Sequence, residues 1–277
     1  MELTYPVLSG LALADYDPAT GIGYVLEAFE GWEGSPASSV DVKQKPRGAG
    51  AWTGKGYANA RHIAAGGKVF MPSFASLVSY ENALNKACSY DNVPLVVDEA
   101  GIVRSCLVKR TDVVLFKRIG PTVAEWSLQV VAEDPRKLYA LVSGSTYLPS
   151  TSGGLALPYT IPYSINALQV TGQLSLVNTG NVAGPVFARI EGPCAGPVIT
   201  HGTQVLSLPS LVLGAGEWLD IDFEKREVLA NGQASRNTFI GSRGWSTFEP
   251  GPNTWSFTAT SYTAGAQLTI TATSADK

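Results

Sequence analysis

Charged residues are scarce in this sequence of 277 residues. Asp, Glu, Lys and Arg make up 16% of the chain, against roughly a quarter in an average protein. The net charge of −3 supplies no general attraction to nucleic acid or to an anionic membrane. No apolar run reaches the length of a membrane span. The opening MELTYPVLSG lacks a basic segment and a long apolar segment, so no signal peptide is expected.

Cysteine and histidine are too few and too scattered for a disulfide framework or a metal site. Cys88, Cys106 and Cys194 are odd in number and form no CxxC motif, which fits a protein made in a reducing cytosol. His62 and His201 have no second ligand nearby in the sequence, and HExxH is absent. The glycines of GAGAWTGKG lack the strand-to-helix context of a phosphate loop. We therefore expect no metal and no cofactor.

Catalytic motifs are absent apart from one pair of carboxylates. GxSxG does not occur, and Asp220 and Asp222 are the only paired acids that suggest glycoside hydrolysis. They alternate with Leu219, Ile221 and Phe223, and the solvent face of an amphipathic strand produces the same spacing. The sequence therefore predicts a protein that is not an enzyme.

The first half of the chain predicts strands, turns and one helix. Apolar residues between Phe74 and Ala87 recur at roughly helical spacing. Ser73 gives a start signal and Pro94 a stop signal, so we expect a helix near residues 73–89. PLVVD, GIVRSCLVKR and WSLQVVAED predict strands.

A long excursion without periodicity is expected over residues 32–68. Its centre, DVKQKPRGAGAWTGKGYANARHI, is basic and rich in glycine, and long loops of this kind are usually functional. The mixture of basic and aromatic residues suits nucleic acid or a protein interface. The net charge disfavours nucleic acid, so a protein interface is expected, with Trp52, Tyr57 and Arg61 as its candidate residues. The basic residues of this cluster are Lys43, Lys45, Arg47, Lys55 and Arg61.

The second half predicts a β-sandwich. Residues 140–160 are mostly Ser, Gly, Pro and Thr, which favours a boundary near 145–160 and domains at 1–148 and 149–277. Beyond them, short alternating runs such as ALQVTGQLSLVNTG and AQLTITATS are separated by turn signals, and no helix is evident.

The stretch GWSTFEPGPNTWSF, residues 244–257, predicts a structural corner between strands. Pro250 and Gly251 suit the two central positions of a type II turn. The aromatic residues on both sides of the turn are expected to pack across it and to seal one end of the sandwich. An exposed aromatic pair would instead stack on sugar rings, so a carbohydrate-binding module remains an alternative. The corner residues are Trp245, Phe248, Pro250, Gly251, Asn253 and Phe257.

With these motifs in place, the sequence resembles the siphophage distal tail proteins (Dit). In that family a strand with alternating acids is followed by a strand ending in NG and by a corner of the form W-x-x-[LF]-x-P-G-x-N-x-x-x-F. The stretch WSLQVVAEDPRKLY also resembles the end of the family's N-terminal domain. The matching positions of the C-terminal third are Trp218, Asp220, Ile221, Asp222, Arg226, Asn231, Gly232, Trp245, Phe248, Pro250, Gly251, Asn253 and Phe257.

The resemblance implies a mainly β fold, with a β-rich N-terminal belt domain that contains one helix and a galectin-like C-terminal sandwich. It implies a structural virion protein at the tail tip, made and assembled in the bacterial host cytoplasm. Six copies would form a ring that joins the tail tube protein to the baseplate hub, a tail-associated protein. The tape measure protein and receptor-binding proteins or fibres are further implied partners. Another ring-forming tail-tube or baseplate component is a second alternative.

Overall fold

The structure is a computed structural model that describes residues 4–149, 172–261 and 265–277. The chain divides into two compact units. Unit 1 comprises Met1–Tyr139 and Asp276–Lys277, and unit 2 comprises Ala140–Ala275. The division lies between residues 139 and 140, whereas the expected boundary lies at 148/149. The strand Lys137–Tyr147 crosses the division and contributes to both units. Most of the expected linker lies outside the described residues.

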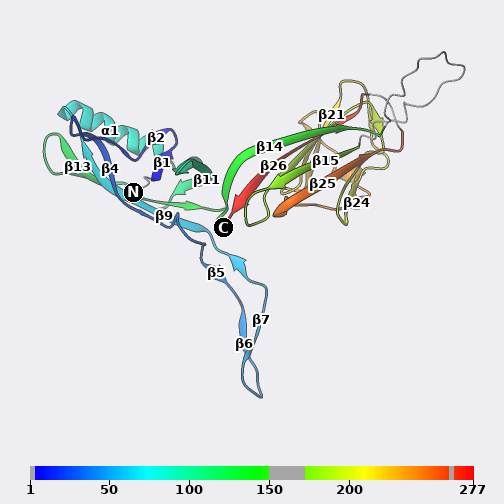
Figure 1. Ribbon diagram of the computed structural model, residues 1–277, viewed down its shortest axis with the longest axis horizontal. Coiled ribbons are helices and arrows are strands. Elements are labelled where there is room, and N and C mark those ends of the chain that lie inside the picture. The colour runs from blue at the N-terminus through cyan, green and yellow to red at the C-terminus, as the bar shows by residue number, and fades with distance from the viewer. Residues whose placement is uncertain (1–3, 150–171, 262–264) are drawn as a thin grey trace, which may run out of the picture. The chain divides into compact units, whose positions relative to one another are not determined.

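In its described residues, unit 1 contains one helix and antiparallel strands (Figure 1). Its elements, including a last strand that continues into unit 2, are β1 (Thr4–Leu8), β2 (Leu11–Ala12), β3 (Asp15–Asp17), β4 (Ile22–Glu30), β5 (Ser38–Ser39), β6 (Val42–Gln44), β7 (Ala51–Thr53), β8 (Tyr57–Ala58), β9 (Arg61–Phe70), α1 (Phe74–Ala87), β10 (Val93–Glu99), β11 (Ile102–Arg110), β12 (Leu115–Arg118), β13 (Val123–Ala132) and β14 (Lys137–Tyr147).

The sheet of unit 1 encloses its core together with α1. The strands follow the order β11-β13-β9-β4-β3, while β1 pairs with β10 and β10 pairs with β11. Alternation along β9 and β13 places Ile63, Val69, Trp126 and Leu128 inward, because successive side chains of a strand point to opposite faces. On the other face of β9 and β13, His62 and Gln129 are exposed and most of the remaining side chains are half-buried.

The expected helix is confirmed as α1. Ser73 caps its first turn, because the Ser73 hydroxyl accepts a hydrogen bond of 3.2 Å from the Ser76 backbone N–H. Leu77, Tyr80 and Leu84 recur at helical spacing and are buried in the core of unit 1.

The expected excursion forms a β-hairpin, which corrects the prediction that it lacks regular structure. β5 pairs with β8, and β6 pairs with β7, both antiparallel. Asn59 closes the base by donating its backbone N–H to the Ala37 carbonyl at 2.7 Å. We call residues 37–59 the arm; Figure 1 shows it as a narrow two-stranded ladder. Almost all side chains of the arm are exposed, so the rest of unit 1 makes few contacts with it.

Unit 2 is a β-sandwich. Besides the end of β14, its elements are β15 (Gln173–Asn178), β16 (Val186–Glu191), β17 (Cys194–Ala195), β18 (Val198–His201), β19 (Gln204–Ser207), β20 (Val212–Leu213), β21 (Trp218–Asp222), β22 (Glu227–Ala230), β23 (Ala234–Ser235), the 3-10 turn η1 (Asn237–Phe239), β24 (Ser242–Arg243), β25 (Gly251–Thr258) and β26 (Gln267–Asp276), whose last residue belongs to unit 1. The sequence predicts no helix in this half of the chain, so the short helical turn η1 corrects that expectation.

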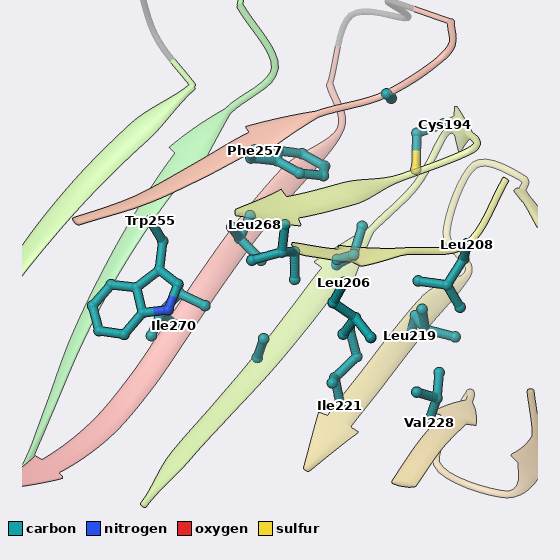
Figure 2. Packing of buried hydrophobic residues seen from close by; sticks show 14 of the residues in the cluster. Cys194, Leu206, Leu208, Leu219, Ile221, Val228, Trp255, Phe257, Leu268 and Ile270 are labelled. Atoms are coloured by element: carbon teal, nitrogen blue, oxygen red, sulfur yellow. The ribbon is translucent and has the colours of Figure 1, made fainter. Parts of the chain in front are cut away.

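Two sheets face each other across the core of unit 2. One sheet runs β14-β26-β16-β21-β22-β23 and the other runs β15-β25-β18-β19-β24. Ile221 and Ile270 of the first sheet share the core with Trp255 and Phe257 of the second (Figure 2). Burying a side chain of this size stabilises the fold by about 1.5–3 kcal/mol. The mainly β class, with a sandwich in the second half, is therefore confirmed. No helix in the described residues is long and apolar enough to cross a membrane.

Candidate interface

The arm presents exposed aromatic and apolar side chains. Trp52 is 59% exposed and Tyr57 is 63% exposed. Trp52 lies opposite Lys43 in the ladder, and the Lys55 ammonium lies 5.6 Å from the centre of the Tyr57 ring. Tryptophan and tyrosine are enriched at protein interfaces. Both predicted residues therefore lie where a partner has access to them.

The arm and the rest of unit 1 carry charges of opposite sign. Lys43, Lys45, Arg47 and Lys55 outnumber Asp41, so the arm has a formal net charge of +3. Residues 1–139 together hold 14 basic and 15 acidic side chains. Removing the arm leaves 10 basic and 14 acidic side chains, a net charge of −4. The arm is therefore electrostatically suited to the body of a second copy of unit 1.

Arg61 does not belong to this exposed surface, which corrects its prediction as an interface residue. It is 2% exposed, because the first residue of β9 points into unit 1. Its guanidinium donates to the carbonyl oxygens of Pro135 at 3.0 Å, Gly31 at 2.8 Å and Trp32 at 3.0 Å. A weaker contact of 3.3 Å reaches the carbonyl of Gly34. Arg61 thus holds residues 31–34, which lead into the arm, against the body of unit 1.

A polar network surrounds this root of the arm. The indole N–H of Trp32 donates to Glu99 at 3.0 Å, and the Lys137 ammonium donates to the Trp32 carbonyl at 3.2 Å. Arg104 pairs with Glu99 and, at 2.8 Å, with Asp276. Burial pushes the pKa of Glu99 upward, but the hydrogen bonds from Trp32 and Arg104 outweigh it and lower this pKa. This network could not be predicted from the sequence, because its members are far apart in the chain.

The predicted corner lies within the sandwich core. Phe248 and Phe257 are fully buried, and Trp245 packs edge-on against Phe223 at 6.0 Å. Gly251 has a φ of 89°, the left-handed conformation that the second central position of a type II turn requires. Asn253 is buried and completes the corner through its side chain.

The side chain of Asn253 bridges the backbone of the corner. Its oxygen accepts from the Glu249 backbone N–H at 3.0 Å. Its amide group donates to the carbonyls of Glu249 at 2.7 Å and Gly251 at 2.8 Å. Trp255 and Phe257 point into the core in Figure 2 and do not form an exposed platform for sugar stacking.

The two candidate carboxylates, Asp220 and Asp222, lie on β21 of unit 2. Asp220 accepts two hydrogen bonds from Arg189, at 2.7 and 3.1 Å. Asp222 accepts from the backbone N–H groups of Glu224 and Lys225 in the following turn. Both carboxylates are therefore engaged within their own face of the sandwich. Among the residues that the structure describes, no group of three or more His, Cys, Asp or Glu is placed to hold a metal ion.

No family model and no curated protein matches the chain. Solved structures do match it along its whole length. The Dit (gp 19.1) protein of phage SPP1 aligns with a TM-score of 0.67 and 14% identity, over 99% of both chains. Its structure is described as a paradigm of the hub adsorption apparatus in phages that infect Gram-positive bacteria. The chain has the fold of a distal tail protein.

A second set of structures agrees with this result. The activated baseplate of phage P2 with Ca aligns with a TM-score of 0.52 and 9% identity, over 97% of both chains. The same baseplate with Sr gives the same score and identity, over 97% of this chain and 98% of the other. The resemblance that the C-terminal motif suggested is thus confirmed at the level of the fold, and it extends to both units.

Proposed function

We propose that this chain is a structural, non-enzymatic virion protein at the distal end of a phage tail. Six copies close into a ring that joins the tail tube protein to the baseplate hub. The observation that carries the proposal is the match in fold to SPP1 Dit over 99% of both chains. The tape measure protein and the receptor-binding proteins or fibres are the further expected partners.

The chemistry of unit 1 supports its role as the belt domain of the ring. A ring of identical subunits needs two different complementary surfaces on each copy. The arm offers one surface, since it is basic and carries the exposed Trp52 and Tyr57. The more acidic body of unit 1 offers a surface of opposite charge. Unit 2 is then available to hold peripheral tail proteins.

The cysteines agree with assembly in a bacterial cytoplasm before release of the virion. Cys88, Cys106 and Cys194 are free and buried. Burial raises the pKa of the Cys106 thiol to about 12 and that of Cys194 to about 11. All three side chains therefore act as small apolar core residues, and the protein does not depend on disulfide formation.

Electron microscopy of the purified full chain, with its mass measured by light scattering, tests the proposal. We expect a single closed ring with sixfold symmetry and six times the mass of one chain. A continuous tube would indicate a tail-tube protein instead. A monomer that does not close into a ring at high concentration, or when mixed with its tail tube protein, would refute the proposed ring.

Deleting residues 43–58 tests the role of the arm. The residues that remain can close as a short loop, because Asn59 already bonds to Ala37. We expect loss of the ring but retention of a folded unit 2, whose core holds Trp255. Light scattering measures the first effect, and hydrogen exchange of the unit 2 amides measures the second. A ring that forms without these residues would contradict the assignment of the arm.

A further inference from the structure

A hollow of about 310 Å³ lies on the open face of the unit 1 sheet. Glu30 of β4 and Gln129 of β13 both pair with Ala64 of β9, so the three residues form one row across the sheet. Neighbouring strands lie about 4.8 Å apart, so the two polar side chains stand roughly 10 Å apart with only a methyl group between them. The small side chain of Ala64 is therefore what leaves the space open. The hollow is lined by Glu30, Gly31, His62, Ile63, Ala64, Thr111, Gln129 and Val130.

The carboxylate of Glu30 is the charged group of this hollow. Other acids of the same face have partners: Glu27 pairs with Lys68 at 2.7 Å and Glu125 with Lys117 at 3.9 Å. In the part of the chain that the structure describes, Glu30 has no such ion pair or side-chain hydrogen bond. The charge and size of the hollow suit a cation that can donate several hydrogen bonds.

The oxygens beside Glu30 make a guanidinium the best fit among side-chain cations. Gln129 and Thr111 also line the hollow, and Gln129 lies across Ala64 from Glu30. Each carries a neutral side-chain oxygen that can accept a hydrogen bond. A guanidinium is planar, carries five N–H donors and pairs with a carboxylate in a bidentate manner. An ammonium would satisfy fewer of these acceptors at once.

The tip of the arm carries such a group. The loop at 45–50 joins β6 to β7, and the Lys45 backbone N–H donates to the Gly50 carbonyl at 3.2 Å. Gly48 and Gly50 have φ angles of 104° and 97°, which permit this tight reversal. Arg47 lies within the loop and is exposed. A guanidinium is thus presented at the end of the basic arm.

The arm of the same chain does not reach this hollow. Gly31 and His62 line the hollow and lie six and three residues in sequence from the two ends of the arm, on the side of its root. Along the ladder, the tip at Lys45 is eight residues beyond Ala37, about 26 Å at 3.3 Å per residue. Folding the tip back would break the pairing of β5 with β8 and of β6 with β7. The occupant must therefore come from another molecule.

We propose that the arm of one copy inserts Arg47 into the hollow of a second copy, where its guanidinium pairs with Glu30. The opposite net charges of the arm and of the rest of unit 1 favour this occupant. Donor and acceptor surfaces are different, so the contact is head-to-tail and repeats around a closed ring. The inference rests on the proposed ring and names the contact that closes it.

Charge reversal in the full-length chain tests the pair. Glu30→Arg and Arg47→Glu should each raise the dissociation constant of the ring about tenfold or more, as loss of a central charged contact does. The double variant should recover most of the loss, because the two charges are exchanged. Native mass spectrometry and sedimentation at graded concentrations measure the effect. Lys86→Glu, a reversal on the exposed end of α1, is the matched control and should leave assembly unchanged.

A cysteine pair tests the position independently of charge. Arg47→Cys combined with Gln129→Cys should form a disulfide between chains when diamide oxidises the two thiols. The native cysteines are buried and do not compete. Either cysteine alone should give no crosslinked series on a denaturing gel.

The outcomes separate this inference from the ring itself. A wild-type ring that tolerates both single reversals and gives no crosslink would overturn the Arg47–Glu30 contact while leaving the ring in place. A wild-type chain without any ring would overturn both. All variants change exposed residues, so circular dichroism should match that of the wild type.

Discussion

Replacing Arg61 is expected to destabilise unit 1 far more than its position beside an exposed arm suggests. In Arg61→Ala, the carbonyls of Pro135, Gly31 and Trp32 lose their donor in a buried site. A hydrogen bond to a charged group contributes about 1.5–3 kcal/mol, and such values do not add fully within one cluster. The void left by the side chain adds to the cost. We expect a loss of about 3–5 kcal/mol in the free energy of unfolding of unit 1.

Urea unfolding followed by hydrogen exchange measures this loss unit by unit. Amides of β9, which begins at Arg61 and pairs with β13, should lose protection in Arg61→Ala, while those of unit 2 serve as an internal reference. Arg61→Lys keeps the charge but cannot span the separate carbonyls, so it should recover only part of the stability. Lys43→Ala is the control, since the Lys43–Asp41 pair is exposed and 3.7 Å long. A loss below about 1 kcal/mol for Arg61→Ala would refute the anchoring role.

Two further predictions concern unit 2. Asn253→Ala removes the three hydrogen bonds that bridge Glu249 and Gly251, so we expect a loss of about 2–4 kcal/mol in urea unfolding; an unchanged midpoint would contradict that role. His201 stacks on Trp255 at 4.6 Å, and burial lowers its pKa below 6.5, against weaker opposing effects of Asn253 and Glu249. The contribution of neutral His201 to the stability of unit 2 should be complete above pH 6.5 and should fall as the pH drops through the folded pKa. Unfolding measured from pH 7.5 to 5 tests this, and His201→Phe should weaken the pH dependence of stability.

Local patterns in the sequence predicted the parts of the fold that local physics determines. The helix followed from the cap at Ser73 and the spacing of Leu77 and Leu84, all within one short segment. The strand β13 followed from alternation of Trp126 and Leu128. The turn at Gly251 followed from the backbone freedom of glycine after proline. Each of these signals lies within a few residues of the structure it specifies.

The arm and its root did not follow from such signals. The arm is held by backbone pairing between residues such as Val42 and Thr53, and exposed strands need no apolar alternation. Arg61 resembled the other basic residues of its segment, and only contacts with the distant Pro135 and Trp32 set it apart. The hollow beside Glu30 depends on three strands meeting in one register, which no single stretch of sequence reveals.

The chain of unit 1 is discontinuous, and this affects the order in which the protein is made. Asp276 completes unit 1 through Arg104 and through the hydroxyl of Tyr139, which donates to it at 2.7 Å. On the ribosome, all of unit 2 is synthesised before that residue. The usual order, in which the N-terminal domain finishes first, is therefore reversed for the last step. A nascent chain therefore stays incomplete at the root of its arm until the sandwich has been made.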